Sequence, residues 1–151
     1  MADLIKTPFK LISPYAKLPG GGTPPAPPVN VVVNGEFTTW TLPFVPDGWE
    51  LRGSAFVQQN PPGNASITDG GGADGFLRQT VLEIGATYSY EFKLTAGGSG
   101  FVGHPSSIIA SCPSPGIYTG TKVASDTRFE IGCLFASGVT VWDYIRFYKI
   151  S

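Results

Sequence analysis

The sequence predicts an all-β protein, an antiparallel β-sandwich of the jelly-roll type. Turn-forming residues are frequent, with 20 glycines and 14 prolines among 151 residues, and they separate short runs of β-branched and aromatic residues. Charged residues make up only 14% of the chain and aromatic residues 13%, a balance that does not suit a helical bundle. The clearest periodicity is the alternation of Tyr88, Tyr90, Phe92 and Leu94 with polar residues, which indicates a strand with one buried face.

The N-terminus is predicted to lie outside this sandwich. Residues 1–18 should form an extended arm, because Pro8 and Pro14 forbid a continuous helix. Residues 19–28 are predicted to be a Gly/Pro-rich linker, and residues 29–151 the β-sandwich domain. The arm has apolar side chains with no evident core of their own to join, so we expect these to bind a partner: Leu4, Ile5, Phe9, Leu11, Ile12 and Tyr15.

The domain begins with strand-like residues from Val29 onward and a turn signal at Asn34-Gly35. A loop with a triple-glycine tip is expected over residues 60–75. The strands on either side of Gly85-Ala86 are expected to pair as a hairpin. The predicted strands lie, in order, near 29–33, 36–40, 48–51, 54–59, 76–84, 88–94, 100–103, 107–111, 116–119, 129–135 and 139–150.

The last two predicted strands suggest which residues face the core. Phe129, Ile131, Cys133 and Phe135 share one parity, which places Cys133 in the core. In the final strand Val141, Asp143, Ile145 and Phe147 should face inward. The opposite face then carries an aromatic and basic stripe formed by Trp142, Tyr144, Arg146 and Tyr148.

Composition excludes several classes of protein. The formal net charge of −1 gives no reason to expect nucleic acid or an anionic membrane as a partner. No apolar run approaches the roughly 18 residues that span a bilayer, and the prolines and lysines of the arm interrupt any signal-peptide core. With only Cys112 and Cys133, the chain is neither a disulfide scaffold nor a zinc site. Whether these two thiols are free or bridged stays open.

No catalytic arrangement is evident, so we predict that the chain is not an enzyme. The single histidine, His104, stands between Gly103 and Pro105, and the sequence around it shows no serine–carboxylate arrangement of the catalytic kind. Asp69 and Asp74 lie in the glycine-rich loop, a context typical of turns. The glycines there are not followed by the Lys-Ser/Thr of a phosphate loop.

Several short motifs, taken in order, resemble the galactose-binding-like jelly rolls of carbohydrate-binding modules. They are Val33-Asn34-Gly35-Glu36-Phe37, Gly48-Trp49, Leu77-Arg78-Gln79-Thr80-Val81, the Gly85-to-Phe92 segment and Val141 to Tyr148. The resemblance covers about residues 30–150. It implies a sandwich of eight or nine strands, often with one structural calcium ion. Carried onto this chain, the calcium ligands would be Glu36 and Asp143, although Thr38 stands where the family often has an acidic residue. The alternative is that these carboxylates accept backbone amides and that no cofactor is bound.

The aromatic and basic stripe is a candidate platform for a glycan, because aromatic rings stack on the apolar faces of sugars. Its residues are Trp142, Tyr144, Arg146 and Tyr148, with Trp40 or Trp49 as additional candidates. The alternative is that these rings fill the core or a subunit interface, where aromatic residues are equally expected. Asn64-Ala65-Ser66 matches a glycosylation acceptor. Without a secretory signal, we interpret this tripeptide as part of a loop.

The arm decides the functional hypothesis. An apolar, proline-broken strap ahead of a small sandwich looks similar to phage virion proteins such as capsid decoration proteins and fibres. We therefore expect a non-enzymatic capsid decoration or cement protein of the virion, assembled in the host cytoplasm, that binds the major capsid protein or neighbouring copies. The alternatives are a stand-alone carbohydrate-binding module, or a tail or fibre subunit that contacts surface glycans. Nucleic acid and membrane are not expected as partners.

Overall fold

The computed structural model describes residues 27–60, 63–68, 76–104, 107–133 and 138–151. Within these residues the chain forms strands and connecting turns, with no helix. The strands are β1 (Glu50–Arg52), β2 (Phe56–Asn60), β3 (Asn64–Thr68), β4 (Phe76–Thr80), β5 (Thr87–Ala96), β6 (Gly100–His104), β7 (Ser107–Cys112), β8 (Gly116–Val123), β9 (Arg128–Cys133) and β10 (Val139–Lys149).

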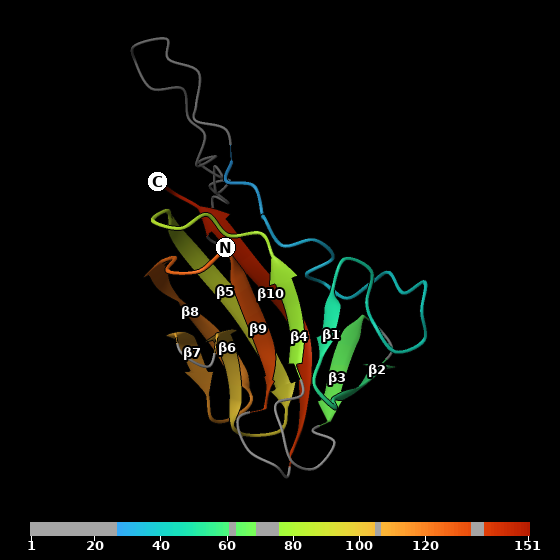
Figure 1. Cartoon of the computed structure of the whole chain (residues 1–151). Coiled ribbons are helices and arrows are strands. Elements are labelled where there is room, and N and C mark those ends of the chain that lie inside the picture. Colours follow the sequence, from blue (N-terminus) through green and yellow to red (C-terminus); the bar gives the residue numbers. More distant parts are fainter. Residues whose placement is uncertain (1–26, 61–62, 69–75, 105–106, 134–137) are drawn as a thin grey trace, which may run out of the picture.

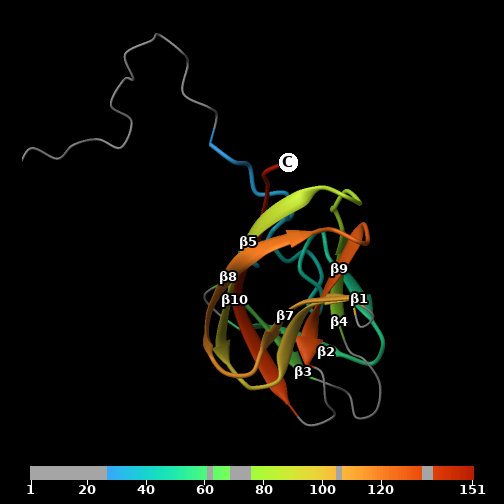
Figure 2. The same cartoon turned by 90° about the vertical axis from the view of Figure 1, so that its left-hand side faces the viewer.

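Two five-stranded sheets pack face to face (Figure 1). The first, called here the β9 sheet, has the order β1-β4-β9-β6-β7, and the second, the β10 sheet, has the order β2-β3-β10-β5-β8. All strand pairs are antiparallel. Seen from the side, β8 and β10 lie in one layer and β4 and β9 in the other (Figure 2). The predicted fold class, an antiparallel β-sandwich, is confirmed.

Aromatic rings from both sheets meet in the core. Phe129 of β9 lies 4.9 Å from the Phe147 ring of β10 and 5.6 Å, edge-on, from Trp49. Phe92 of β5 completes the cluster at 5.1 Å from Phe147. Phe92 and Phe129 are 0% exposed and Phe147 is 1% exposed. Because fully burying one such side chain contributes roughly 1.5–3 kcal/mol, this cluster holds the two sheets together.

The alternation predicted around β5 is confirmed, but its predicted hairpin is wrong. Tyr88, Phe92 and Leu94 are buried, and Tyr90 of the same predicted face is half-buried, with its ring stacked on Phe92 at 4.6 Å. The polar residues between them are only partly covered. β5 does not pair with β4, however, because the two strands belong to different sheets. The Gly85-Ala86 turn carries the chain from one sheet to the other, with the Gly85 amide donating to the Ala124 carbonyl at 2.8 Å.

The segment before β1 runs beside β10 without forming a named strand. The strand predicted at 29–33 is reduced to one isolated bridge between Asn30 and Tyr148, and the chain turns at Asn34, which has a φ of +47°. Gly35 lies against β10, where the Cβ of any other residue would stand 2.2 Å from the Ile145 carbonyl oxygen. The buried Gln79 side chain takes the place of a strand partner for Val33. Its Oε1 accepts a hydrogen bond from the Val33 amide at 3.0 Å, and its Nε2 donates one to the Val33 carbonyl.

An irregularity in β10 changes which of its residues face the core. Val141 is opposite Ala96, Trp142 is opposite Leu94 and Tyr144 is opposite Lys93, which leaves one extra residue in each strand. On β10 this bulged residue is Asp143, and beyond it the alternation resumes with Ile145 and Phe147 buried. The bulge brings Trp142 to the same side as Ile145, so Trp142 lies in the core with 0% exposure.

The two cysteines are buried and form no disulfide with each other. Cys112 of β7 and Cys133 of β9 both lie opposite Gly100 of β6. Their Cα atoms are therefore two strand spacings apart, roughly 9.5 Å, whereas a disulfide spans at most about 7 Å. The predicted burial of Cys133 is confirmed.

The predicted arm, the linker up to residue 26 and the Gly70–Gly72 loop tip lie outside the described residues. The described chain begins beside the C-terminus, at the end of the sandwich where Asn30 meets Tyr148 (Figure 1). In the described part of the chain, no helix is long and apolar enough to cross a membrane.

Candidate functional site

The outward face of the β10 sheet carries a group of aromatic and charged side chains. Tyr144, Arg146 and Tyr148 stand on β10, and the register places Lys93, Glu91 and Ser89 of β5 beside them, one opposite each. We call the five residues Tyr144, Arg146, Tyr148, Glu91 and Lys93 the Arg146 face. On the far side of β5, the register places Ile117, Thr119 and Thr121 of β8 opposite Lys93, Glu91 and Ser89 respectively.

Arg146 is at the centre of this face and makes three contacts. Its Nε donates to Glu36 at 2.8 Å, and its Nη1 donates to Glu91 at 3.0 Å. Its guanidinium carbon also lies 4.0 Å from the centre of the Tyr144 ring, a cation–π contact. The Glu36 carboxylate raises the pKa of Arg146. The guanidinium is thus enclosed by two carboxylates and one aromatic ring.

Tyr144 is only partly exposed, and its phenol is held neutral. Partial burial and the neighbouring Glu91 carboxylate raise its pKa to about 12. A neutral phenol keeps its proton as a hydrogen-bond donor. Beside it, Lys93 forms an ion pair of 2.6 Å with Asp143, so the second cation of the face is also matched by a carboxylate.

The structure brings together three of the four predicted platform residues. Tyr144, Arg146 and Tyr148 share the outward face, as the alternation predicted. Trp142 does not join them, because the bulge turns its indole into the core, where its Nε1 donates to Thr140 Oγ1 at 3.2 Å. Trp49 is likewise a core residue, 6% exposed. Whether the remaining stripe binds a glycan or a protein stays a prediction.

Glu36 and Asp143, the predicted calcium ligands, do not come together as a site. Glu36 pairs with Arg146 and Asp143 pairs with Lys93, so each carboxylate is already matched by a cation. Asp143 is 31% exposed, and its predicted inward orientation is wrong because it is the bulged residue. A calcium ion takes six to eight oxygen ligands, and the described residues contain no group of three His, Cys, Asp or Glu side chains that could hold a metal. This pair of carboxylates therefore does not fit the ion.

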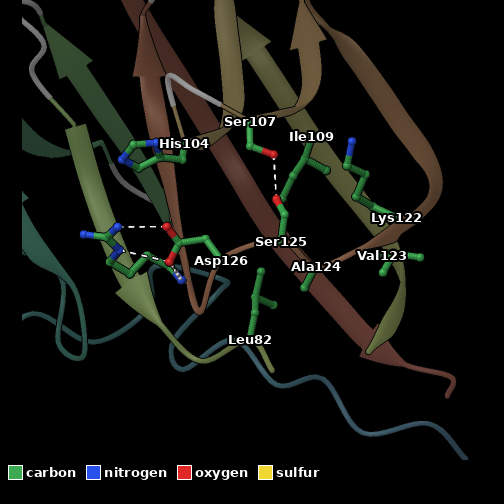
Figure 3. Close-up of a pocket in the computed structure, with 10 residues that line it drawn as sticks. Leu82, His104, Ser107, Ile109, Lys122, Val123, Ala124, Ser125 and Asp126 are labelled. Atoms are coloured by element: carbon green, nitrogen blue, oxygen red, sulfur yellow. Dashed lines mark hydrogen bonds and ion pairs between the residues drawn. The ribbon is translucent and has the colours of Figure 1, made fainter. Parts of the chain in front are cut away.

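A small cavity lies at one end of the sandwich, with His104, Ser107, Ser125 and Asp126 among its lining residues (Figure 3). Its volume is about 10 Å³, room for about one water molecule and none for a sugar. His104 is the last residue of β6. Asp126 is bound by Arg128 at 2.8 Å, which lowers the pKa of Asp126. Asp69 and Asp74 lie outside the described residues.

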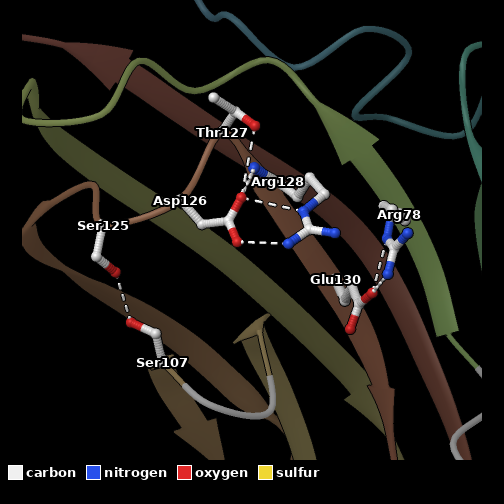
Figure 4. Close-up of polar contacts among 7 residues, drawn as sticks. All are labelled: Arg78, Ser107, Ser125, Asp126, Thr127, Arg128 and Glu130. Atoms are coloured by element: carbon white, nitrogen blue, oxygen red, sulfur yellow. Dashed lines mark hydrogen bonds and ion pairs between the residues drawn. The ribbon is translucent and has the colours of Figure 1, made fainter.

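The β9 sheet carries an ion pair of a different kind on its outward side. The Arg78 guanidinium binds Glu130 on the neighbouring strand, with its Nε donating at 2.7 Å (Figure 4). The Glu130 side chain is 2% exposed and the Arg78 side chain 13% exposed. Because both side chains are largely buried, we interpret this pair as structural.

Sequence analysis missed one exposed aromatic pair. Phe44, in the turn that precedes β1, and Phe56, at the start of the edge strand β2, are 50% and 47% exposed, with ring centres 5.7 Å apart. The only sequence signal was the apolar Leu42-Pro43-Phe44-Val45 run between the strands predicted at 36–40 and 48–51.

Comparison with known proteins gives a fold match only. No protein-family model matches the sequence, and no curated protein matches it either. Among solved structures, the chain is similar to the CBM22-1 xylan-binding domain from Paenibacillus barcinonensis, with a TM-score of 0.57 and 11% identity over 78% of this chain and 92% of that one. A family 29 carbohydrate-binding module superposes with a TM-score of 0.48 and 12% identity over 74% of this chain and 85% of that one. None of these findings points to a virion protein.

Proposed function

We propose that the chain is a non-catalytic carbohydrate-binding domain and that it binds a polysaccharide on the Arg146 face. The observation that carries the proposal is Tyr144, a partly exposed neutral tyrosine whose ring is fixed by Arg146 at 4.0 Å among surface carboxylates. The β-sandwich fold agrees with this, since the similar CBM22-1 domain is named for xylan binding.

The chemistry of the face suits a sugar. An aromatic ring packs against the C–H groups of a pyranose, and carboxylate oxygens and a phenol hydrogen-bond its hydroxyl groups. Here Tyr144 and Tyr148 supply the rings, and Glu91 and Asp143 supply acceptors next to them. A side chain held in one orientation also loses little conformational entropy when it binds. The contacts of Arg146 with Tyr144 and Glu91 would provide that preorganisation.

The test is the affinity of the full chain for soluble xylan, measured by affinity electrophoresis and calorimetry, in matched variants. Tyr144→Ala removes the ring, and we expect it to weaken binding at least about tenfold, the effect of losing an aromatic contact of about 1.5 kcal/mol. Tyr144→Phe keeps the ring and should retain most of the affinity. Ile84→Ala, which truncates a 69% exposed side chain in a turn, serves as the surface control.

The result contradicting the proposal is equally clear. If neither xylan nor other neutral polysaccharides such as galactomannan and hydroxyethylcellulose retard the folded protein, the domain is not a carbohydrate-binding module. If binding occurs but Tyr144→Ala and Ile84→Ala bind equally well, the Arg146 face is not the site.

The virion hypothesis has no support from the described residues. It rested on the arm, whose apolar side chains lie outside them, and it remains an untested prediction. The carbohydrate-binding alternative is favoured because it accounts for an observed surface of the domain.

A further inference from the structure

The ion pairs of the Arg146 face bear on which polysaccharides it accepts. Arg146 and Lys93 are its two cations, and each is held by a carboxylate: Arg146 by Glu36 and Glu91, and Lys93 by Asp143. When Glu36 and Asp143 are counted with the five residues of the Arg146 face, three carboxylates stand against two cations, a local formal charge of −1.

An arginine on a sugar-binding surface would ordinarily attract an acidic sugar, because its planar guanidinium forms paired hydrogen bonds with a carboxylate or sulfate. Here two of the five guanidinium N–H hydrogens and the positive charge are already matched by carboxylates of the protein itself. Glu36 takes the Nε hydrogen at 2.8 Å and Glu91 takes an Nη1 hydrogen at 3.0 Å. The Tyr144 ring lies against the guanidinium plane at 4.0 Å. A uronate approaching the remaining N–H hydrogens of Arg146 would meet the Glu36 and Glu91 carboxylates at close range, and their negative charges would repel it.

From this arrangement we infer that Glu36 and Glu91 are specificity-determining residues: by neutralising Arg146 they exclude acidic polysaccharides and restrict the face to uncharged ones. The inference rests on the proposed function. It goes further in naming the class of ligand that is rejected and the two side chains that reject it. The physical basis is repulsion between the carboxylates of the protein and those of an acidic polysaccharide.

The two carboxylates have separable roles. Glu91 contacts both Arg146 and the Tyr144 phenol, so its removal also alters the aromatic platform. Glu36 approaches Arg146 from the segment before β1, and Arg146 is the partner it is seen to bind. Glu36→Gln is therefore the cleaner variant, and Glu36→Gln/Glu91→Gln is the stronger one.

The experiment compares the affinity of the full chain for xylan and for polygalacturonate at low ionic strength, by affinity electrophoresis and calorimetry. We expect the wild type to bind polygalacturonate at least about tenfold more weakly than xylan. Glu36→Gln should narrow this ratio, and Glu36→Gln/Glu91→Gln should narrow it about tenfold, with the gained affinity falling as sodium chloride is added. Glu83→Gln is the matched control: it removes the same charge from a 2.6 Å ion pair with Lys149 and should leave the ratio unchanged.

Different results would overturn the two proposals. A wild type that binds polygalacturonate as well as xylan overturns the inference but leaves carbohydrate binding intact. So does a double variant that binds xylan yet gains no more affinity for polygalacturonate than Glu83→Gln does. A wild type that binds neither polygalacturonate nor any of the neutral polysaccharides xylan, galactomannan and hydroxyethylcellulose refutes both proposals at once.

Discussion

The buried Arg78–Glu130 pair allows a stability prediction whose size follows from its exposure. Arg78→Met keeps the length of the side chain but removes the guanidinium from a carboxylate that is only 2% exposed. Removing one partner of a buried ion pair typically costs 3–5 kcal/mol, because the remaining charge stays without a partner. Arg78 itself is 13% exposed, and water can enter where it was, so we expect the lower end, about 3 kcal/mol.

The assay is urea denaturation monitored by tryptophan fluorescence. The dependence of the unfolding free energy on urea concentration must be the same in all variants for their stabilities to be compared. Arg78→Met/Glu130→Met should recover most of the loss, because a buried pair replaced as a unit by apolar side chains is often neutral. Arg128→Met is the matched control: its partner Asp126 and Arg128 itself are 28% and 41% exposed, so solvent screens the charge that remains. Its loss should be clearly smaller than that of Arg78→Met.

Two outcomes would show the reasoning to be incorrect. If Arg78→Met and Arg128→Met lose equal stability, the burial of Glu130 does not set the cost. If the double variant is as unstable as Arg78→Met, the loss comes from packing of the arginine stem, not from the unpaired carboxylate.

Two further predictions concern buried polar groups of the core. Gln79→Met should destabilise the fold by about 1–3 kcal/mol, since it leaves the Val33 amide and carbonyl without their partners. Faster hydrogen exchange at the Val33 amide would verify the cause, and unchanged exchange would contradict it. Burial raises the pKa of Cys112 to about 12. The folded state therefore keeps a proton that the unfolded state releases above about pH 8.5, and stability should fall as pH rises from there toward 12, by up to 1.4 kcal/mol per unit. Cys112→Ala should flatten this part of a denaturation profile, and an equal slope in both proteins would exclude the thiol as its source.

The parts of the fold that follow from local pattern were predictable. The alternation of Tyr88, Tyr90, Phe92 and Leu94 with polar residues identifies the core-facing side of a strand, because side-chain direction in a strand has a period of two. Low charge and frequent turn formers likewise indicate many short strands. Both arguments use neighbouring residues alone, and both agree with the structure.

Strand partners were not predictable in the same way. The turn at Gly85-Ala86 has the composition of a hairpin, yet β4 and β5 pair with strands far away in the sequence. A short connection can join two strands of one sheet or lead across to the opposite sheet, and the choice depends on which partners complete each sheet. For β4 that partner is β9, some fifty residues later, whose Glu130 receives Arg78. The residues around β4 do not indicate which distant strand it pairs with.

The sequence contains a signal for the bulge at Asp143, but strict alternation does not allow for a bulge. Strict alternation places Asp143 inward, where an unpaired carboxylate is costly, and the two expectations drawn from the sequence, a calcium ion or backbone amides as partners, would each offset that cost. A bulge resolves it with no ligand, because one extra residue turns the carboxylate outward to Lys93. Trp142 and Ile145 are three positions apart, an odd number, so both can face the core only if one residue between them is left out of the alternation. A charged residue between two large apolar ones at odd spacing is thus itself the signal for a bulge. Here that bulge separates the buried Trp142 from the exposed Tyr144, and it leaves the Arg146 face as a surface of tyrosines and ion pairs.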